Sequence, residues 1–258
     1  MVYDYATFSY CFNIENIDLY YFRTNKVINM DNLFNRCYKL KYLNMSQFKT
    51  ENLISIRKMF KYCKSIASTN LSNFNFEKVI SFYQLFEGFE NLEEIDLSHT
   101  RAPLLNYMHY TFKDCINLKR VLLPENITEI KTLSQTFYNC HQIEYINLTS
   151  FKGSKNLQNL EYMFYNCSSL KNIEFPNINA IELLSAQYMF SFCSSVKSII
   201  MSNFLTNKLN NLDKMFYGCD NLISLDISNL YTSSKINIKN IFQGVESNIT
   251  IRVNKDTY

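Results

Sequence analysis

A repeat of about 26 residues runs through almost the whole of this 258-residue chain. Each copy carries a phenylalanine that is followed three residues later by a small apolar position, which is most often cysteine. Successive phenylalanines lie 26 residues apart, except for one step of 25 and one of 27. A period of this length predicts a solenoid, in which each copy forms one coil that contacts only its neighbours. We number the repeats 1 to 10 by their phenylalanines: Phe8, Phe34, Phe60, Phe86, Phe112, Phe137, Phe164, Phe190, Phe216 and Phe242.

Three apolar positions follow the cysteine position, and in repeat 9 they are Leu222, Leu225 and Ile227. The last two are separated by one residue, so they point to the same side of a short strand while polar Asp226 points to the other side. A strand of this length is unstable alone and needs neighbours. The pattern predicts ten short strands stacked into one parallel sheet with a single buried face.

The segment before the cysteine has a different apolar spacing. In repeat 3 the apolar residues are Leu53, Ile56, Met59, Phe60 and Cys63, which lie three, three, one and three residues apart. This spacing predicts a short strand or turn that leads into one or two helical turns with an inward apolar stripe. We therefore expect one right-handed α/β solenoid of about ten 26-residue coils, with the sheet on one face and short helical turns opposite. It forms a single domain over residues 1–258.

Some repeats depart from the pattern. Thr69 stands where repeat 3 should carry a strand leucine, and Phe89 and Val245 replace the cysteine of repeats 4 and 10. The adjacent steps of 25 and 27 residues indicate a one-residue deletion and a one-residue insertion in neighbouring coils, which we expect in the outer loops.

All eight cysteines occupy the same repeat position: Cys11, Cys37, Cys63, Cys115, Cys140, Cys167, Cys193 and Cys219. Phe89 and Val245 keep the apolar character of this position without the sulfur, which favours a role as small, buried apolar residues. Neighbouring coils bring these residues within disulfide range, but parallel Cβ vectors disfavour a bond. No second cysteine or histidine lies at metal-ligand spacing. We expect free thiols, with some disulfides as the alternative.

Charge and motifs exclude several classes of function. A net charge of +3 gives no reason to expect binding to nucleic acid or to a membrane surface. No run of 18 apolar residues is present, so we expect no membrane insertion in this segment. The chain has no zinc-protease, nucleophile-elbow or phosphate-loop motif, and its Asp residues do not converge as calcium ligands must. We expect no enzyme activity, no cofactor and no metal.

Two segments resemble a known repeat family. MFYGCDNLISLDIS, from Met215 to Ser228, resembles the mycoplasma-type leucine-rich repeat of BspA-like surface proteins, and Cys115 to Cys140 resembles the related treponemal type. The resemblance implies a curved α/β solenoid on the surface of bacteria or protists, where members adhere to host matrix proteins or to other cells. It implies no catalytic residues. No secretory signal begins the chain and no polar cap closes either end, so we expect a segment of a longer protein.

The exposed face of the sheet is the expected binding surface, because solenoids offer such faces to partners. Each strand shows two outward positions, and the second is mostly Asp or Asn. These polar side chains have a simpler explanation as exposed residues that cap the following turn. Tyrosine and arginine are enriched in interface hot spots, so the central group is the candidate site. Its members are Tyr42, Glu94, Asp96, Arg120, Leu122, Tyr145 and Glu174.

We therefore expect a non-enzymatic protein-binding or adhesion module of a cell-surface protein. Its partner would be a host matrix protein, another cell-surface protein or a glycan, bound on the exposed sheet face. The alternative is an intracellular structural scaffold subunit buried within a larger assembly. Within a longer parent protein the expected location is extracellular, and a complete chain would be cytoplasmic. Six N-glycosylation sequons occur, at Asn44, Asn70, Asn126, Asn147, Asn166 and Asn248.

Overall fold

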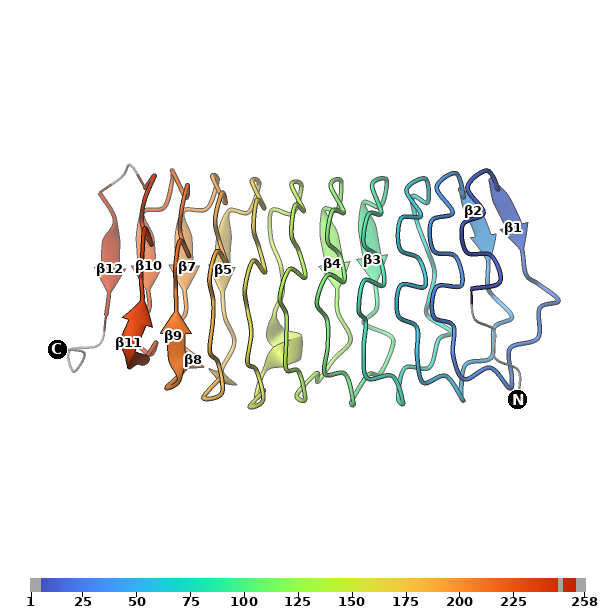
Figure 1. The fold of residues 1–258 in the computed structure, drawn as a ribbon, viewed down its shortest axis with the longest axis horizontal. Helices are drawn as coiled ribbons and strands as arrows, with labels where there is room; N and C mark the ends of the chain where they lie inside the picture. The colour runs from blue at the N-terminus through green and yellow to red at the C-terminus, as the bar shows by residue number, and fades with distance from the viewer. Residues whose placement is uncertain (1–5, 246–247, 254–258) are drawn as a thin grey trace.

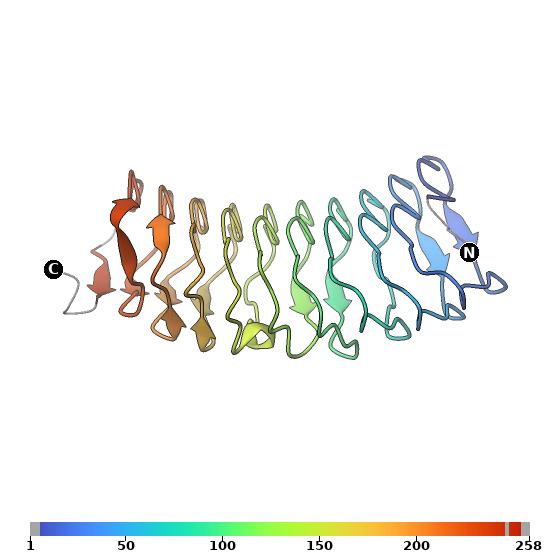
Figure 2. The same cartoon turned by 60° about the horizontal axis from the view of Figure 1, so that its bottom comes forward.

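The computed structural model describes residues 6–245 and 248–253, which form an elongated, gently bowed parallel β-solenoid (Figures 1 and 2). The coils follow one another in chain order along the long axis, and there are about nine turns. The prediction of ten coils counted one too many, because ten phenylalanines enclose nine complete repeats. Residues 1 and 258, the predicted domain limits, lie outside the described residues.

Eight short strands form the sheet face, and each consists of the residues predicted from the apolar alternation. They pair in parallel at the repeat spacing, as in Asn16 with Tyr42. The strands are β1 (Asn16–Asp18), β2 (Tyr42–Asn44), β3 (Glu94–Asp96), β4 (Arg120–Leu122), β5 (Asn172–Glu174), β7 (Ser198–Ile200), β10 (Ser224–Asp226) and β12 (Thr250–Arg252).

The sheet face is not one continuous sheet, so that prediction is wrong. It is divided into β1–β2, β3–β4 and β5–β7–β10–β12. The two breaks fall at residues 68–70 and 145–147, which adopt no strand structure. The first break contains Thr69, a polar residue at a core position. The second has apolar Ile146 at the same position and needs another explanation.

A second face of the solenoid also carries parallel pairing, in the segment before the phenylalanine where the apolar spacing allowed a short strand or turn. Its strands are β9 (Leu209–Asn211) and β11 (Thr232–Asn237), which pair in parallel. A separate parallel pair, β6 (Ile178–Asn179) with β8 (Phe204–Leu205), lies at the turn that follows the sheet-face strands. Isolated bridges, such as Asn29 with Ser55, extend the pairing of the second face through earlier repeats. Turns capped by side chains end these segments, as where the Asp31 N–H donates to Asn29 Oδ1.

The predicted helical turns are wrong, and the chain is a β-solenoid rather than an α/β one. In each repeat the residues two before and two after the phenylalanine have positive φ, as Lys58 (58°) and Tyr62 (59°) do around Phe60. A right-handed helix cannot contain such residues. The Phe60 N–H instead donates to the Leu85 carbonyl of the next coil, at 3.1 Å. The described residues include only one short helix, the 3₁₀ segment η1 (Thr149–Phe151).

The repeat phenylalanines form one continuous stack through the core. All ten rings lie in sequence, with centroids 5.5–5.9 Å apart and planes within 3–13° of parallel. Such offset-stacked rings add to the stabilisation from burial alone. The stack holds successive coils at a common spacing, and the apolar strand residues complete the same core.

The eight cysteines are free thiols, as predicted. Seven are buried, and each of these donates its S–H to the phenylalanine carbonyl of the preceding repeat at 3.0–3.1 Å. Burial raises the pKa of Cys37 to about 11 and that of Cys219 to about 12. In repeat 4, Phe89 takes the position and packs edge-on against Phe60 and Phe86.

Candidate binding cleft on the sheet face

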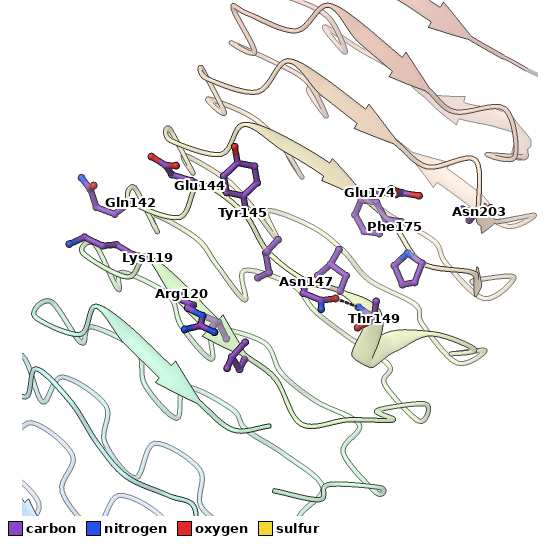
Figure 3. Close-up of a pocket in the computed structure, with 15 residues that line it drawn as sticks. Lys119, Arg120, Gln142, Glu144, Tyr145, Asn147, Thr149, Glu174, Phe175 and Asn203 are labelled. Atoms are coloured by element: carbon purple, nitrogen blue, oxygen red, sulfur yellow. Dashed lines mark hydrogen bonds between the residues drawn. The ribbon is translucent and has the colours of Figure 1, made fainter. Parts of the chain in front are cut away.

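The second break in the sheet face opens into a cleft of about 920 Å³ between β4 and β5 (Figure 3). Repeats 5, 6 and 7 supply nearly all of its lining. The lining residues are Lys119, Arg120, Val121, Leu122, Gln142, Glu144, Tyr145, Ile146, Asn147, Leu148, Thr149, Glu174, Phe175, Pro176 and Asn203. A volume of this size lies within the range of small-ligand and anchor-residue pockets.

The paired deletion and insertion lie beside this cleft. The turn from Leu123 to Ile127 is one residue shorter than the same turn in repeat 4, which runs from Leu97 to Ala102. The turn from Leu148 to Ser154 is one residue longer, and it contains η1. Both changes therefore lie where sheet-face segments end, and not in outer loops as predicted. The segment 145–147 between these two turns is not paired with β4, while the phenylalanine stack below stays regular.

The base of the cleft is apolar. Val121, Leu148 and Phe175 are buried core residues at its base, whereas Leu122 and Ile146 are half-buried. The corresponding strand residue of the next repeat, Ile173, is buried, so the displacement of the 145–147 segment exposes apolar surface that other repeats bury.

Charged side chains surround this base, and most are paired between neighbouring repeats. Lys119 contacts Glu93 at 2.8 Å, Arg120 contacts Glu94 at 3.0 Å and Lys171 contacts Glu144 at 2.5 Å. The Lys171 ammonium also lies 5.6 Å from the Tyr145 ring centroid. These pairs are solvent-exposed and contribute little stability, so their arrangement bears more on which partners can approach.

The structure brings four of the seven predicted site residues together. Arg120, Leu122, Tyr145 and Glu174 line the cleft, and Tyr145 is 60% exposed. Glu94 lies on β3 beside Arg120, outside the cleft lining. Asp96 is also on β3, and Tyr42 is on β2 beyond the first break in the sheet.

Asp96 has a structural role that the sequence analysis kept as an alternative. Its carboxylate accepts hydrogen bonds from the Ser98 hydroxyl at 2.6 Å and from the Ser98 N–H at 2.8 Å, and this bonding lowers the pKa of Asp96. The same capping of the N–H two residues ahead recurs along the outward column, at Asp18, Asn44, Asn70, Asn147 and Asp226. Within the described part of the chain no three His, Cys, Asp or Glu side chains gather as metal ligands.

The sequence analysis did not single out several residues of the cleft, including Lys119, Gln142 and Glu144. A signal for two of them was present in the repeat. At the position before the strand, glutamate in one repeat is followed by lysine in the next repeat three times along the chain. These pairs join neighbouring coils, as Glu15 and Lys41 do at 2.9 Å. Comparing charges at one repeat position would have placed Lys119 and Glu144 beside the sheet face.

Comparisons with known proteins support this architecture. Residues 83–207 and 109–250 match the BspA-type leucine-rich repeat region, and residues 5–125 match a family described as a Mycoplasma protein of unknown function. A comparison with curated proteins gave no match in sequence. None of the described residues form a helix with the length and hydropathy needed to cross a bilayer.

Among solved structures, a leucine-rich repeat protein from Bacteroides ovatus is similar over 96% of this chain, with 22% identity and a TM-score of 0.60. This chain spans 63% of that protein, which is less than two thirds of its length. A leucine-rich cell surface protein from Faecalibacterium prausnitzii matches at 15% identity and a TM-score of 0.36, over 93% of this chain and 83% of that one. The sequence match to the repeat region covers more than half of the chain, which therefore belongs to the BspA-type leucine-rich repeat family.

Proposed function

We propose that this chain is a non-enzymatic binding module of a cell-surface protein and that it holds its partner against the cleft on the sheet face. Leucine-rich repeats are typically protein-binding modules, and the family supports this class of function. The observation that carries the proposal is the convergence of Arg120, Leu122, Tyr145 and Glu174 on one cleft. The partner is a host matrix protein, another surface protein or a glycan.

The composition of the cleft suits recognition rather than catalysis. An apolar base surrounded by tyrosine, arginine and other polar groups resembles the centre of a protein interface, where a few anchors carry most of the binding energy. Tyr145 offers an exposed ring at the edge, and the half-buried Leu122 and Ile146 offer apolar surface at the base. Adhesion follows if the parent protein displays this face outside the cell.

Binding to purified extracellular-matrix glycoproteins and to a printed glycan array tests the proposal. We expect the chain to bind at least one of these probes. Replacing Arg120 and Tyr145 together with alanine should weaken that binding by about tenfold or more, because two anchors are lost. A double variant Tyr21→Ala and Arg23→Ala is the matched control, since both side chains are exposed in the first coil. Equal affinity of the cleft variant and the wild-type chain would contradict the proposal.

The second candidate is a structural scaffold inside a larger assembly. It is favoured by exposed apolar side chains at one position of repeats 3, 4 and 8, where Ile54, Ile80 and Leu184 are 47–48% exposed. An assembly partner would cover this surface. Antibody labelling of intact and permeabilised cells separates the two: labelling of intact cells supports adhesion, and labelling only after permeabilisation supports the scaffold.

A further inference from the structure

The β4 edge of the cleft carries backbone groups without partners. On its other side β4 is fully paired with β3, where the Arg120 N–H donates to the Glu93 carbonyl at 3.2 Å and the Leu97 N–H donates to the Leu122 carbonyl at 2.8 Å. Alternate residues of a parallel strand direct their N–H and C=O groups to opposite neighbours. The N–H groups of Val121 and Leu123 therefore face repeat 6, and within the described residues neither makes a hydrogen bond.

The opposite edge of the cleft is equally unpaired. The segment 145–147 belongs to no strand, and its backbone makes no hydrogen bond to β4 or to β5 within the described part of the chain. The cleft holds water-accessible space between the two edges. An unpaired strand edge is a template for a further extended chain, which can gain affinity through main-chain hydrogen bonds.

One carboxylate at the cleft also has no partner. Glu174, at the end of β5, is exposed and lies next to Phe175 of the apolar base (Figure 3). The described structure gives it neither an ion pair nor a hydrogen bond, whereas Glu144 across the cleft is paired with Lys171. A partner with a basic side chain at this point would complement the charge.

We propose that the cleft binds an extended peptide segment of the partner protein, which rests on the proposed function of this face. The peptide main chain hydrogen-bonds to the β4 edge at Val121 and Leu123. One apolar side chain of the peptide lies on the half-buried Leu122 and Ile146, and a lysine or arginine side chain faces Glu174. Main-chain bonds supply affinity, and the two side chains supply specificity.

Selection from a phage-displayed library of random linear dodecapeptides tests this proposal on the intact chain. We expect selected peptides to share a basic residue close to an apolar one. Calorimetry with a synthetic selected peptide should show at least threefold weaker binding to Glu174→Gln, and the loss should shrink at high salt. Glu51→Gln removes an equal charge from an exposed turn and should leave binding unchanged. Equal binding by Glu174→Gln and wild type would overturn the charge assignment.

The main-chain contacts have a separate readout. The Val121 carbonyl faces the cleft together with the Val121 N–H, and it accepts no backbone hydrogen bond within the described residues, so it would accept from a peptide N–H. N-methylation of that peptide amide should weaken binding by about fivefold or more, because the donor is removed and the Val121 carbonyl is left unpaired. Saturating peptide should slow amide hydrogen exchange at Val121 and Leu123, while residues 68–70 at the other break serve as the unbound reference. Unchanged exchange at both amides, or a methylation scan without effect, would overturn the extended-peptide mode.

Failure of this proposal can be told apart from failure of the proposed function. If no library peptide binds, yet the Arg120 and Tyr145 double variant loses a matrix protein that the wild type holds, the partner presents a folded surface. If that variant loses only a signal on the glycan array, the ligand is a saccharide. In either case the cleft remains the binding site and the extended-peptide proposal is wrong.

Discussion

Single residues set the spacing of this solenoid through the phenylalanine stack. Phe137 is fully buried between Phe112 and Phe164, with ring centroids 5.5 Å away on both sides. We expect Phe137→Ala to lower the free energy of unfolding by about 3–5 kcal/mol, because it removes a large buried ring and leaves a cavity. Urea denaturation followed by circular dichroism measures this. Phe192→Ala is the control, since Phe192 is 39% exposed, and an equal loss from both variants would contradict the stack's role.

The buried thiols predict both reactivity and pH dependence. Seven cysteines should resist iodoacetamide at pH 8 in the folded chain, and all eight should react in urea. Because burial raises their folded pKa values above the ordinary value of 9.0, stability is full below pH 9 and falls as pH rises toward the folded values. Each thiol that ionises only on unfolding lowers the unfolding free energy by about 1.4 kcal/mol per pH unit in that window.

Chemical denaturation between pH 8 and pH 11 measures this slope. Cys63→Ala removes one buried thiol and should make the alkaline slope shallower. Constant stability across the range, or rapid alkylation of the seven buried thiols in the folded state, would contradict the buried arrangement.

At the scale of elements, the corner around each phenylalanine depends on residues with positive φ. Gly88 has φ of 75°, and a Cβ at this position would lie 2.3 Å from the Tyr62 ring. Gly153 has φ of 81°, and an added Cβ would have no atom within 4 Å. Substitution of Gly153 therefore measures the backbone strain alone, without a steric clash. We expect Gly153→Ala to cost about 1–2 kcal/mol and Gly88→Ala to cost clearly more, because it adds a steric clash. Thermal denaturation of the two variants measures the difference, and equal costs would contradict the close contact with Tyr62.

The break at residues 145–147 should depend on the paired deletion and insertion. Inserting one serine after Glu125 and deleting Ser150 restores 26-residue steps on both sides of Phe137. We expect the segment 145–147 to pair with β4 in this variant, which would close the cleft and slow amide exchange at these residues. Inserting the serine alone is the comparison. Fast exchange in the repaired variant would show that the indels do not cause the break.

The sequence predicted the strands better than the corners, for a physical reason. Alternation such as Leu225–Asp226–Ile227 is typical of a half-buried strand, and most sheet-face strands lie where it occurs, although Ile146–Asn147–Leu148 has the same alternation and forms no strand. The spacing of Ile56, Met59 and Cys63 suits a helical stripe and equally suits a tight corner whose N–H groups bond to the next coil. Backbone dihedrals decide between them, and a non-glycine residue such as Lys58 gives no sign of its positive φ.

The candidate site was only partly predictable as well. Outward positions followed from strand alternation, so Arg120, Tyr145 and Glu174 were placed on the correct face. The cleft depends on where the extra residue of repeat 6 is accommodated, and the repeat spacing alone does not locate it. Asp96 was also placed correctly on the exposed sheet face, but its carboxylate caps the following turn and does not line the cleft.

For the whole molecule, stacking produces a long face with one interruption suited to binding. The phenylalanine stack and the column of buried cysteines continue beneath the cleft, so the break in the sheet does not divide the hydrophobic core. A partner can therefore bind at the interruption without the coils separating. The partner is therefore expected to bind at the cleft between β4 and β5 and at no other part of the solenoid surface.

Photo-crosslinking tests that claim most directly. A benzoylphenylalanine replacing Tyr145 places the reactive group at the cleft, and one replacing Leu184, which is 47% exposed next to the bridges of the second face, is the matched reference. Each variant is irradiated with the matrix glycoprotein that the wild-type chain binds most tightly. The account predicts a covalent adduct from position 145 and none from position 184. An adduct from position 184 alone would place the binding surface on the other face and contradict it.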